Sequence, residues 1–84
     1  MEIKAGDKVR IKSWEAMEAE FGLDEDGDIN CLPYVTGKMR WACGATLTVQ
    51  EITSEARHLE FFMEEDPGTF FAAWMVEEVI QSEI

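Results

Sequence analysis

The sequence has few basic residues and no long apolar run, and these two absences exclude several partners. Only 7 Lys and Arg stand against 18 Asp and Glu in 84 residues, so the net charge is −11. Phosphate backbones and anionic lipids repel such a chain, and we expect it to bind neither nucleic acid nor membrane. A membrane-spanning helix needs roughly 20 consecutive apolar residues, which the sequence nowhere supplies. The opening stretch, MEIKAGDKVRIK, lacks the apolar segment of an export signal, which predicts a cytoplasmic protein.

Cysteine and histidine are also scarce, which limits metal binding and nucleophilic catalysis. The two cysteines, Cys31 and Cys43, are twelve positions apart, and His58 is the only histidine. A zinc site built from these three residues lacks a fourth ligand and the short spacing between ligands that such sites have. Nothing in the spacing pairs a cysteine nucleophile with a histidine base. We therefore expect free thiols, no metal, no cofactor and no enzymatic activity.

Aromatic residues are plentiful and predict a packed core. Three Trp, five Phe and one Tyr raise the hydrophobic content to 46%, enough for a small domain without disulfides. Adjacent phenylalanines occur at 61–62 and 70–71, and neighbours in a strand face opposite ways. One phenylalanine of each pair should therefore point inward, while the other lies outside or under another part of the chain. Most of the aromatics are expected in the core, including Trp14, Trp41, Trp74, Phe61 and Phe70.

The first third of the chain predicts a strand followed by a helix. Val9 and Ile11 alternate with charged residues, which is the period of a half-buried strand. Ser13 is a suitable N-cap for a helix over 14–21, whose apolar residues share one stripe. Gly22 follows at the position where a helix stops.

The rest of the chain predicts a loop, a short helix and then mostly strands. Residues 23–35 form the loop, and a short helix is expected over 37–43 with Met39 and Trp41 packed inward. Strands are expected at 45–52, 57–63 and 69–72, with a turn at 64–68. A helical turn then leads to a last brief strand at 79–80.

These elements together predict a mainly β protein. Five short strands with tight turns bury one face best by curling into a small barrel. We expect a single domain over residues 1–84, with an acidic insertion of helix and loop at about 13–44.

The segments GDKVRIKSW, MEAEFGLDEDGDI, TGKMRWACGATLTVQEI and WMVEEVI resemble small uncharacterised proteins of bacteria and their phages, for which an SH3-like β-barrel is expected. Many SH3-like barrels share the opening Gly-Asp-x-Val-x-Ile, in which a turn leads into the first strand. The resemblance spans about residues 4–80 and implies a fold, with no activity attached. More than thirty residues separate the first strand from Ala45, which exceeds the usual peptide-binding loop of an SH3 domain. The groove aromatics of SH3 domains are therefore not transferred to this chain.

The stretch DEDGDIN, residues 24–30, is the strongest candidate for a metal site. A calcium-binding EF-hand loop needs oxygen ligands at positions 1, 3 and 5, glycine at 6 and glutamate at 12. With Asp24 at position 1, the residues at positions 6 and 12 are Ile29 and Val35. Placing Gly27 at position 6 instead puts Gly22 at 1 and Pro33 at 12. The pattern therefore favours a charged turn, although weak calcium binding stays open.

The charge distribution predicts a protein-interaction module without enzymatic activity, present as a monomer or weak homodimer. Carboxylates speed the encounter with a basic protein or peptide, and exposed aromatics supply adhesion. The predicted contact residues are Glu15, Glu18, Glu20, Asp24, Glu25, Asp26, Asp28 and Tyr34. The alternative is a nucleic-acid mimic, which presents carboxylates in place of phosphates and inhibits a DNA-binding host protein.

Overall fold

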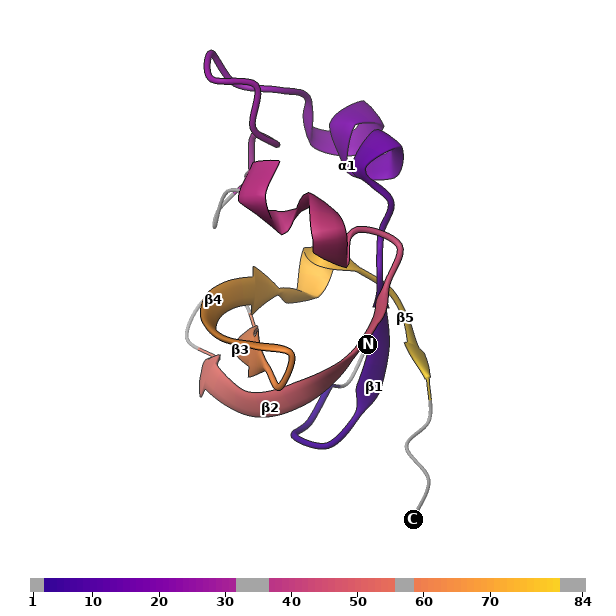
Figure 1. Cartoon of the computed structure of the whole chain (residues 1–84), viewed down its shortest axis with the longest axis vertical. Coiled ribbons are helices and arrows are strands. Elements are labelled where there is room, and N and C mark those ends of the chain that lie inside the picture. Colours follow the sequence, from indigo (N-terminus) through magenta and orange to yellow (C-terminus); the bar gives the residue numbers. More distant parts are fainter. Residues whose placement is uncertain (1–2, 32–36, 56–58, 81–84) are drawn as a thin grey trace.

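The protein is mainly β, with one short α-helix and two 3-10 helices (Figure 1). The computed structural model describes residues 3–31, 37–55 and 59–80. The strands are β1 (Lys8–Ile11), β2 (Thr46–Ser54), β3 (Glu60–Met63), β4 (Asp66–Ala72) and β5 (Val76–Ile80). The helices are α1 (Trp14–Phe21), η1 (Gly37–Ala42) and η2 (Ala73–Met75). None of the described helices has the length and apolar character needed to span a bilayer.

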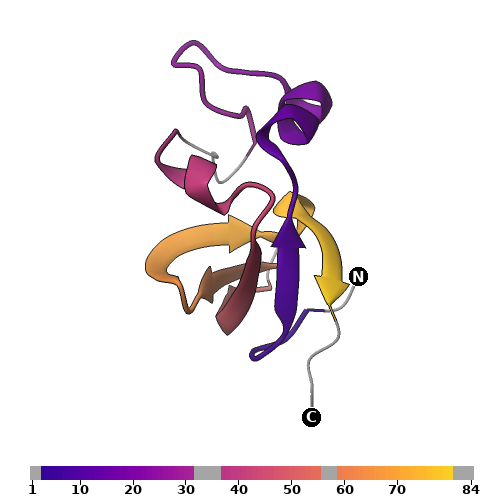
Figure 2. The same cartoon turned by 45° about the vertical axis from the view of Figure 1, so that its right-hand side comes forward.

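The five strands form one antiparallel sheet in the order β4-β3-β2-β1-β5. The sheet curls strongly, and β4 arches over towards η2 (Figure 2). In the ladders seen among the described residues, β4 pairs only with β3 and β5 only with β1, so the sheet is not closed. The prediction of a mainly β fold is confirmed at this level.

A tight turn leads into β1, which lies between β2 and β5 in the sheet. Gly6 has φ of +92°, a conformation that glycine adopts without strain, and its N–H donates to the Val49 carbonyl at 2.8 Å. The buried Asp7 carboxylate accepts a hydrogen bond from the Lys4 N–H at 3.0 Å, which satisfies it locally. Val9 then lies opposite both Leu47 of β2 and Val79 of β5. The turn spans Lys4–Asp7 and is centred on Ala5 and Gly6, one residue before the predicted position, whereas the inward Val9 is as predicted.

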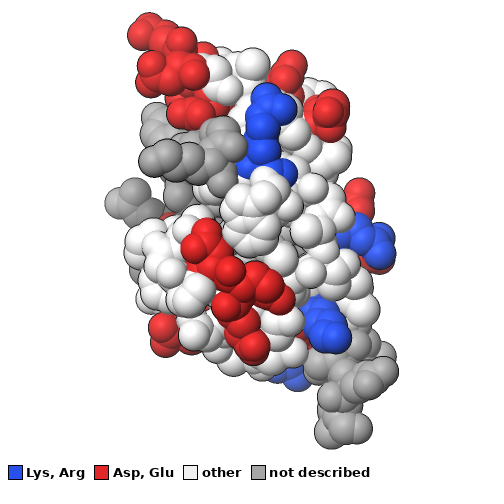
Figure 3. All heavy atoms as spheres, in the orientation of Figure 1, with Lys and Arg blue, Asp and Glu red and all other residues white. Residues whose placement is uncertain are grey.

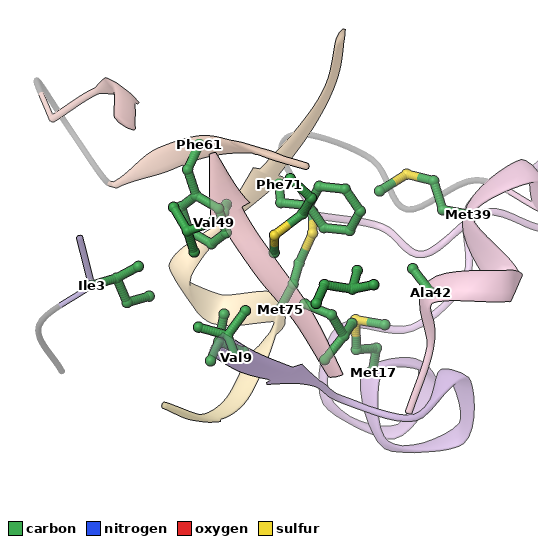
Figure 4. Close-up of a cluster of buried hydrophobic side chains, with 14 of the residues drawn as sticks. Ile3, Val9, Met17, Met39, Ala42, Val49, Phe61, Phe71 and Met75 are labelled. Carbon is green, nitrogen blue, oxygen red and sulfur yellow. The ribbon is translucent and has the colours of Figure 1, made fainter. Parts of the chain in front are cut away.

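One apolar core joins the sheet to the segment between β1 and β2 (Figure 4). Val49, Phe61 and Phe71 come from the sheet and are at most 1% exposed. Met17 of α1 and Met39 of η1 belong to the same buried cluster. The segment between β1 and β2 therefore shares its buried core with the sheet.

Several boundaries differ from the predicted ones, and β3 begins only at Glu60, because Leu59 lies outside the strand. Strand β2 extends to Ser54, and β4 begins at Asp66, so the expected turn shrinks to two residues. Strand β5 begins at Val76, because β1 pairs with it from Ile11↔Val76 to Lys8↔Ile80. The expected helical turn is only the three residues of η2. For β2, β4 and β5, pairing with a neighbouring strand extends the ladder past the local turn signal.

Candidate functional site

Helix α1 presents its carboxylates to solvent because its apolar stripe faces the core. The Ser13 Oγ accepts a hydrogen bond from the Ala16 N–H at 3.1 Å, which caps the first turn. Trp14 and Met17 are buried, so the intervening positions face outward. The exposed carboxylates of the helix are Glu15, Glu18 and Glu20. The prediction of this helix, with its cap and its stop at Gly22, is confirmed.

The loop after α1 is shaped by its own backbone. Leu23 and Ile29 form an isolated antiparallel bridge, and Ile29 is fully buried. Between them, one carboxylate oxygen of Asp24 accepts from the N–H groups of Asp26 at 2.8 Å and Asp28 at 3.0 Å. The Asp24 N–H donates to the Asp28 carbonyl at 2.9 Å. Asp24 therefore folds the loop as an Asx turn.

Two residues at the tip of this loop are left facing solvent. Glu25 and Asp26 directly follow Asp24 and are exposed, and Gly27 supplies the positive φ of +83° that the turn requires. Figure 3 shows acidic side chains gathered over this loop, at the end of the molecule. Among the described residues, no three His, Cys, Asp or Glu side chains come together so that they could hold a metal ion.

Two cations, Arg10 of β1 and Lys12 directly after it, form ion pairs with carboxylates. Lys12 pairs with Glu20 at 2.7 Å, and the Lys12 ammonium also lies 5.7 Å from the centre of the Phe21 ring. Arg10 pairs with Glu77 and Glu78 of β5. Of the predicted contact residues, Glu20 is therefore partly neutralised.

Four exposed carboxylates remain on the acidic arm, by which we mean α1 and the loop 22–30. Among the described side chains, no ion pair joins a cation to Glu15, Glu18, Glu25 or Asp26. Asp24 and Asp28 are only half exposed and belong to the framework of the loop. Tyr34, also predicted as a contact residue, lies outside the described residues.

The acidic arm meets η1 along a seam that carries an aromatic group and a thiol. The Arg40 guanidinium stacks on the Trp14 ring at 4.0 Å from its centre. The Cys43 thiol donates to the Met39 carbonyl at 3.7 Å. Burial raises the pKa of Cys43 above its ordinary value; Arg40 opposes this shift and Glu15 adds to it. Cys43 is therefore a protonated thiol at neutral pH, a poor nucleophile.

Two aromatic residues expected in the core are instead exposed. Trp41 is 48% exposed, because it is the neighbour of Met39 and Ala42, which take the inward positions of the 3-10 helix. Phe70 is also 48% exposed, because Phe71 takes the inward position in β4. These two predictions are wrong, but the expectation that adjacent phenylalanines face opposite ways is confirmed.

The two cysteines are free thiols in the structure. Cys31 is buried in the core cluster and Cys43 is half-buried in the seam. His58, the histidine weighed as their partner, lies outside the described residues.

The comparisons with known proteins add no family to these observations. No family model, no curated protein and no solved structure matches the chain.

Proposed function

We propose that the protein is a non-enzymatic interaction module whose acidic arm binds a basic segment of another protein. The observation that carries this proposal is the set of four exposed carboxylates without an ion pair among the described side chains, on Glu15, Glu18, Glu25 and Asp26. Carboxylates of one sign raise the rate of encounter with a cationic partner.

The arm is suited to binding because it is anchored. Met17 and Ile29 are fully buried, one on the helix and one at the base of the loop. The backbone that carries Glu18, Glu25 and Asp26 lies between these anchors and therefore loses little conformational freedom on binding. Trp41, half exposed at the adjoining η1, supplies apolar area of the kind that dominates interface energies.

The curled sheet supports a finer fold assignment, an SH3-like barrel. Five short strands, a turn at Lys4–Asp7 leading into β1, and the arch of β4 in Figure 2 are its support. In this assignment residues 13–44 are an insertion between the first two strands. Its role is to carry the acidic arm.

Binding of a labelled, lysine-rich peptide tests the proposed function. Fluorescence anisotropy at low salt should show saturable binding that weakens steeply as salt is raised, because exposed charges are screened. The double variant Glu25→Gln/Asp26→Asn should bind several-fold more weakly. The matched control Glu55→Gln/Glu77→Gln removes the same charge from exposed positions off the arm and should bind nearly as the wild type does. Equal losses in both variants would show that only net charge acts, and absence of binding at low salt would refute the function.

The alternative function, a mimic of nucleic acid, has less support. On the face seen in Figure 3 the carboxylates form separate groups, one over the acidic loop and one over the β3–β4 turn. A mimic needs a continuous track of carboxylates in place of phosphates. Competition with DNA for a purified DNA-binding protein tests this alternative directly.

A further inference from the structure

The outer face of the β3–β4 hairpin carries a pair of phenylalanines, of which Phe70 is exposed and Phe62 is half-buried. The rings of Phe62 and Phe70 lie 5.0 Å apart between centres, at an interplanar angle of 46°. Phe70 is 48% exposed, whereas Phe61 and Phe71 beside them are at most 1% exposed. The pair is therefore separate from the core and presents aromatic surface to solvent. We call it the outer phenylalanine pair.

A carboxylate lies next to this pair across the sheet. Glu51 of β2 is the direct cross-strand partner of Phe62, so the two side chains share the outer face. Glu51 is exposed, and none of the ion pairs found among the described side chains includes it. The turn of the same hairpin adds Glu64 and Glu65, the latter accepting a hydrogen bond from the Thr48 N–H at 2.9 Å. The aromatic surface is thus flanked by negative charge.

The aromatic rings and the neighbouring carboxylate together determine which kind of partner this surface can bind. A purely apolar partner would leave Glu51 at the margin of a dry contact, where loss of its hydration is costly. A second copy of the chain would bring another charge of −11 to the same place. A cation gains from both components, because it is attracted to the faces of aromatic rings and to the carboxylate. Arginine suits the site better than lysine, since its planar guanidinium stacks on rings while its N–H groups pair with a carboxylate.

The backbone of β4 favours contact through side chains over strand addition. Pro67 lacks an N–H, and the β3–β4 ladder shifts register between Phe61 and Met63. Both features interrupt the row of hydrogen-bonding groups that an added strand would need. The partner is therefore expected to insert a side chain between the ring pair and Glu51.

We propose that the outer phenylalanine pair and Glu51 form a second binding site, which takes an arginine side chain of a basic partner segment. The site deepens the function proposed above and rests on it for the class of partner. It is chemically distinct from the acidic arm, because its binding depends on aromatic rings as well as on charge.

Titration of the intact protein with a short blocked peptide of alternating Gly and Arg tests the site. The ring signals of the phenylalanines are followed by NMR, together with the backbone amides. The rings of Phe62 and Phe70 and the amide of Glu51 should shift, while the rings of Phe61 and Phe71 serve as buried controls in the same spectrum. The lysine counterpart of the peptide should shift the same signals less, and the glutamate counterpart should not shift them.

Two variants assign the shifts to the site. Phe70→Ser and Glu51→Gln should each weaken the affinity for the arginine peptide, as measured from these shifts, about fivefold to tenfold, as truncation of an interface anchor does. Both positions are exposed, so the fold should persist; if Phe70→Ser unfolds the protein, Glu51→Gln still provides the test. Glu55→Gln, at an exposed position that belongs neither to this site nor to the acidic arm, should leave the ring shifts unchanged.

The outcomes separate this site from the proposed function. Shifts confined to the acidic arm would overturn the second site and leave the proposed function intact. No shift anywhere in the protein would overturn both. Equal shifts with the glutamate peptide, or a dimer in sedimentation that Phe70→Ser abolishes, would show an apolar contact without selection for arginine and would overturn the site.

Discussion

At the scale of single residues, burial separates neighbours that have the same side chain. Phe71 is 1% exposed and packs in the core, whereas Phe70 is 48% exposed. We expect Phe71→Ala to lower the free energy of unfolding by about 3–5 kcal/mol, because it leaves a cavity in a packed interior. Phe70→Ala should cost less than about 1 kcal/mol, as surface substitutions do. Urea denaturation of the two variants checks this contrast, and equal losses would contradict the assignment of faces in β4.

Asp24 is expected to act as a cap for the loop and not as a metal ligand. Asp24→Ala removes the oxygen that accepts from Asp26 and Asp28, so the exchange of these two amides with solvent should speed up. Asp24→Asn keeps an acceptor oxygen at the same place and should preserve their protection. Hydrogen exchange followed by NMR provides the measurement.

The same spectra address calcium binding by residues 24–28. Added calcium should shift these amides no more than an equal concentration of magnesium does, because one oxygen of Asp24 already accepts two N–H groups. A saturable response to calcium alone, lost in Asp24→Asn, would contradict this account of the loop.

Cys43 provides a prediction about pH. Because burial raises the pKa of its thiol, alkylation by iodoacetamide should have a midpoint above that of a free cysteine. Glu15→Gln removes a charge that raises this pKa, and it should therefore speed alkylation at a given pH. A group whose pKa is raised on folding stabilises the fold below its unfolded pKa, and this contribution is lost as the pH rises through the folded pKa. A midpoint below the ordinary value would contradict the burial of Cys43 in the seam.

At the scale of elements, the cap of α1 links local sequence to the proposed site. Ser13→Ala should lower the free energy of unfolding by about 0.5–2 kcal/mol, because the Ala16 N–H loses its acceptor. Ser13→Asp restores an acceptor and adds a charge that the helix dipole favours, so it should recover most of the loss. Thermal and urea unfolding of the pair measure this, and equal destabilisation by both variants would argue against the cap.

The sequence was most informative where the signals are local. Ser13, the apolar stripe of α1 and Gly22 lie within one short segment, and the structure has the helix where they place it. The alternating strands around Val9 and Val49 were also predictable, because a period of two is visible without knowledge of the partner strand.

Other features depend on contacts between distant segments and were missed for that reason. Trp41 was expected inside, but the 3-10 geometry of η1 gives the inward positions to Met39 and Ala42. The proximity of Glu51 to Phe62 follows from a β2–β3 ladder with two register shifts, which no local pattern reveals. The carboxylates of the acidic arm could be found from the sequence alone. The distinction between the exposed carboxylates and the structural Asp24 required the hydrogen bonds of the loop.

At the scale of the whole molecule, the shared core makes the acidic arm and the sheet one cooperative unit. Met17 comes from α1, Met39 from η1 and Phe61 from the sheet, yet all three belong to one buried cluster (Figure 4). An arm that frayed independently would lose the order that the proposed function needs, because the partner would have to restore it on binding. The cooperativity of unfolding is therefore a test of the function as well as of the fold.

Met17→Ala tests this cooperativity, since Met17 is fully buried and links α1 to the rest of the core. We expect a loss of about 2–5 kcal/mol in the free energy of unfolding, with a single transition seen by both tryptophan fluorescence and circular dichroism. The control Glu18→Ala alters an exposed position of the same helix and should change stability by about 0.5 kcal/mol or less. Because the arm is held through the same contact, Met17→Ala should also weaken binding of the basic peptide although it removes no charge. Two separate transitions, or peptide binding unchanged by Met17→Ala, would show that the arm folds and binds independently of the sheet.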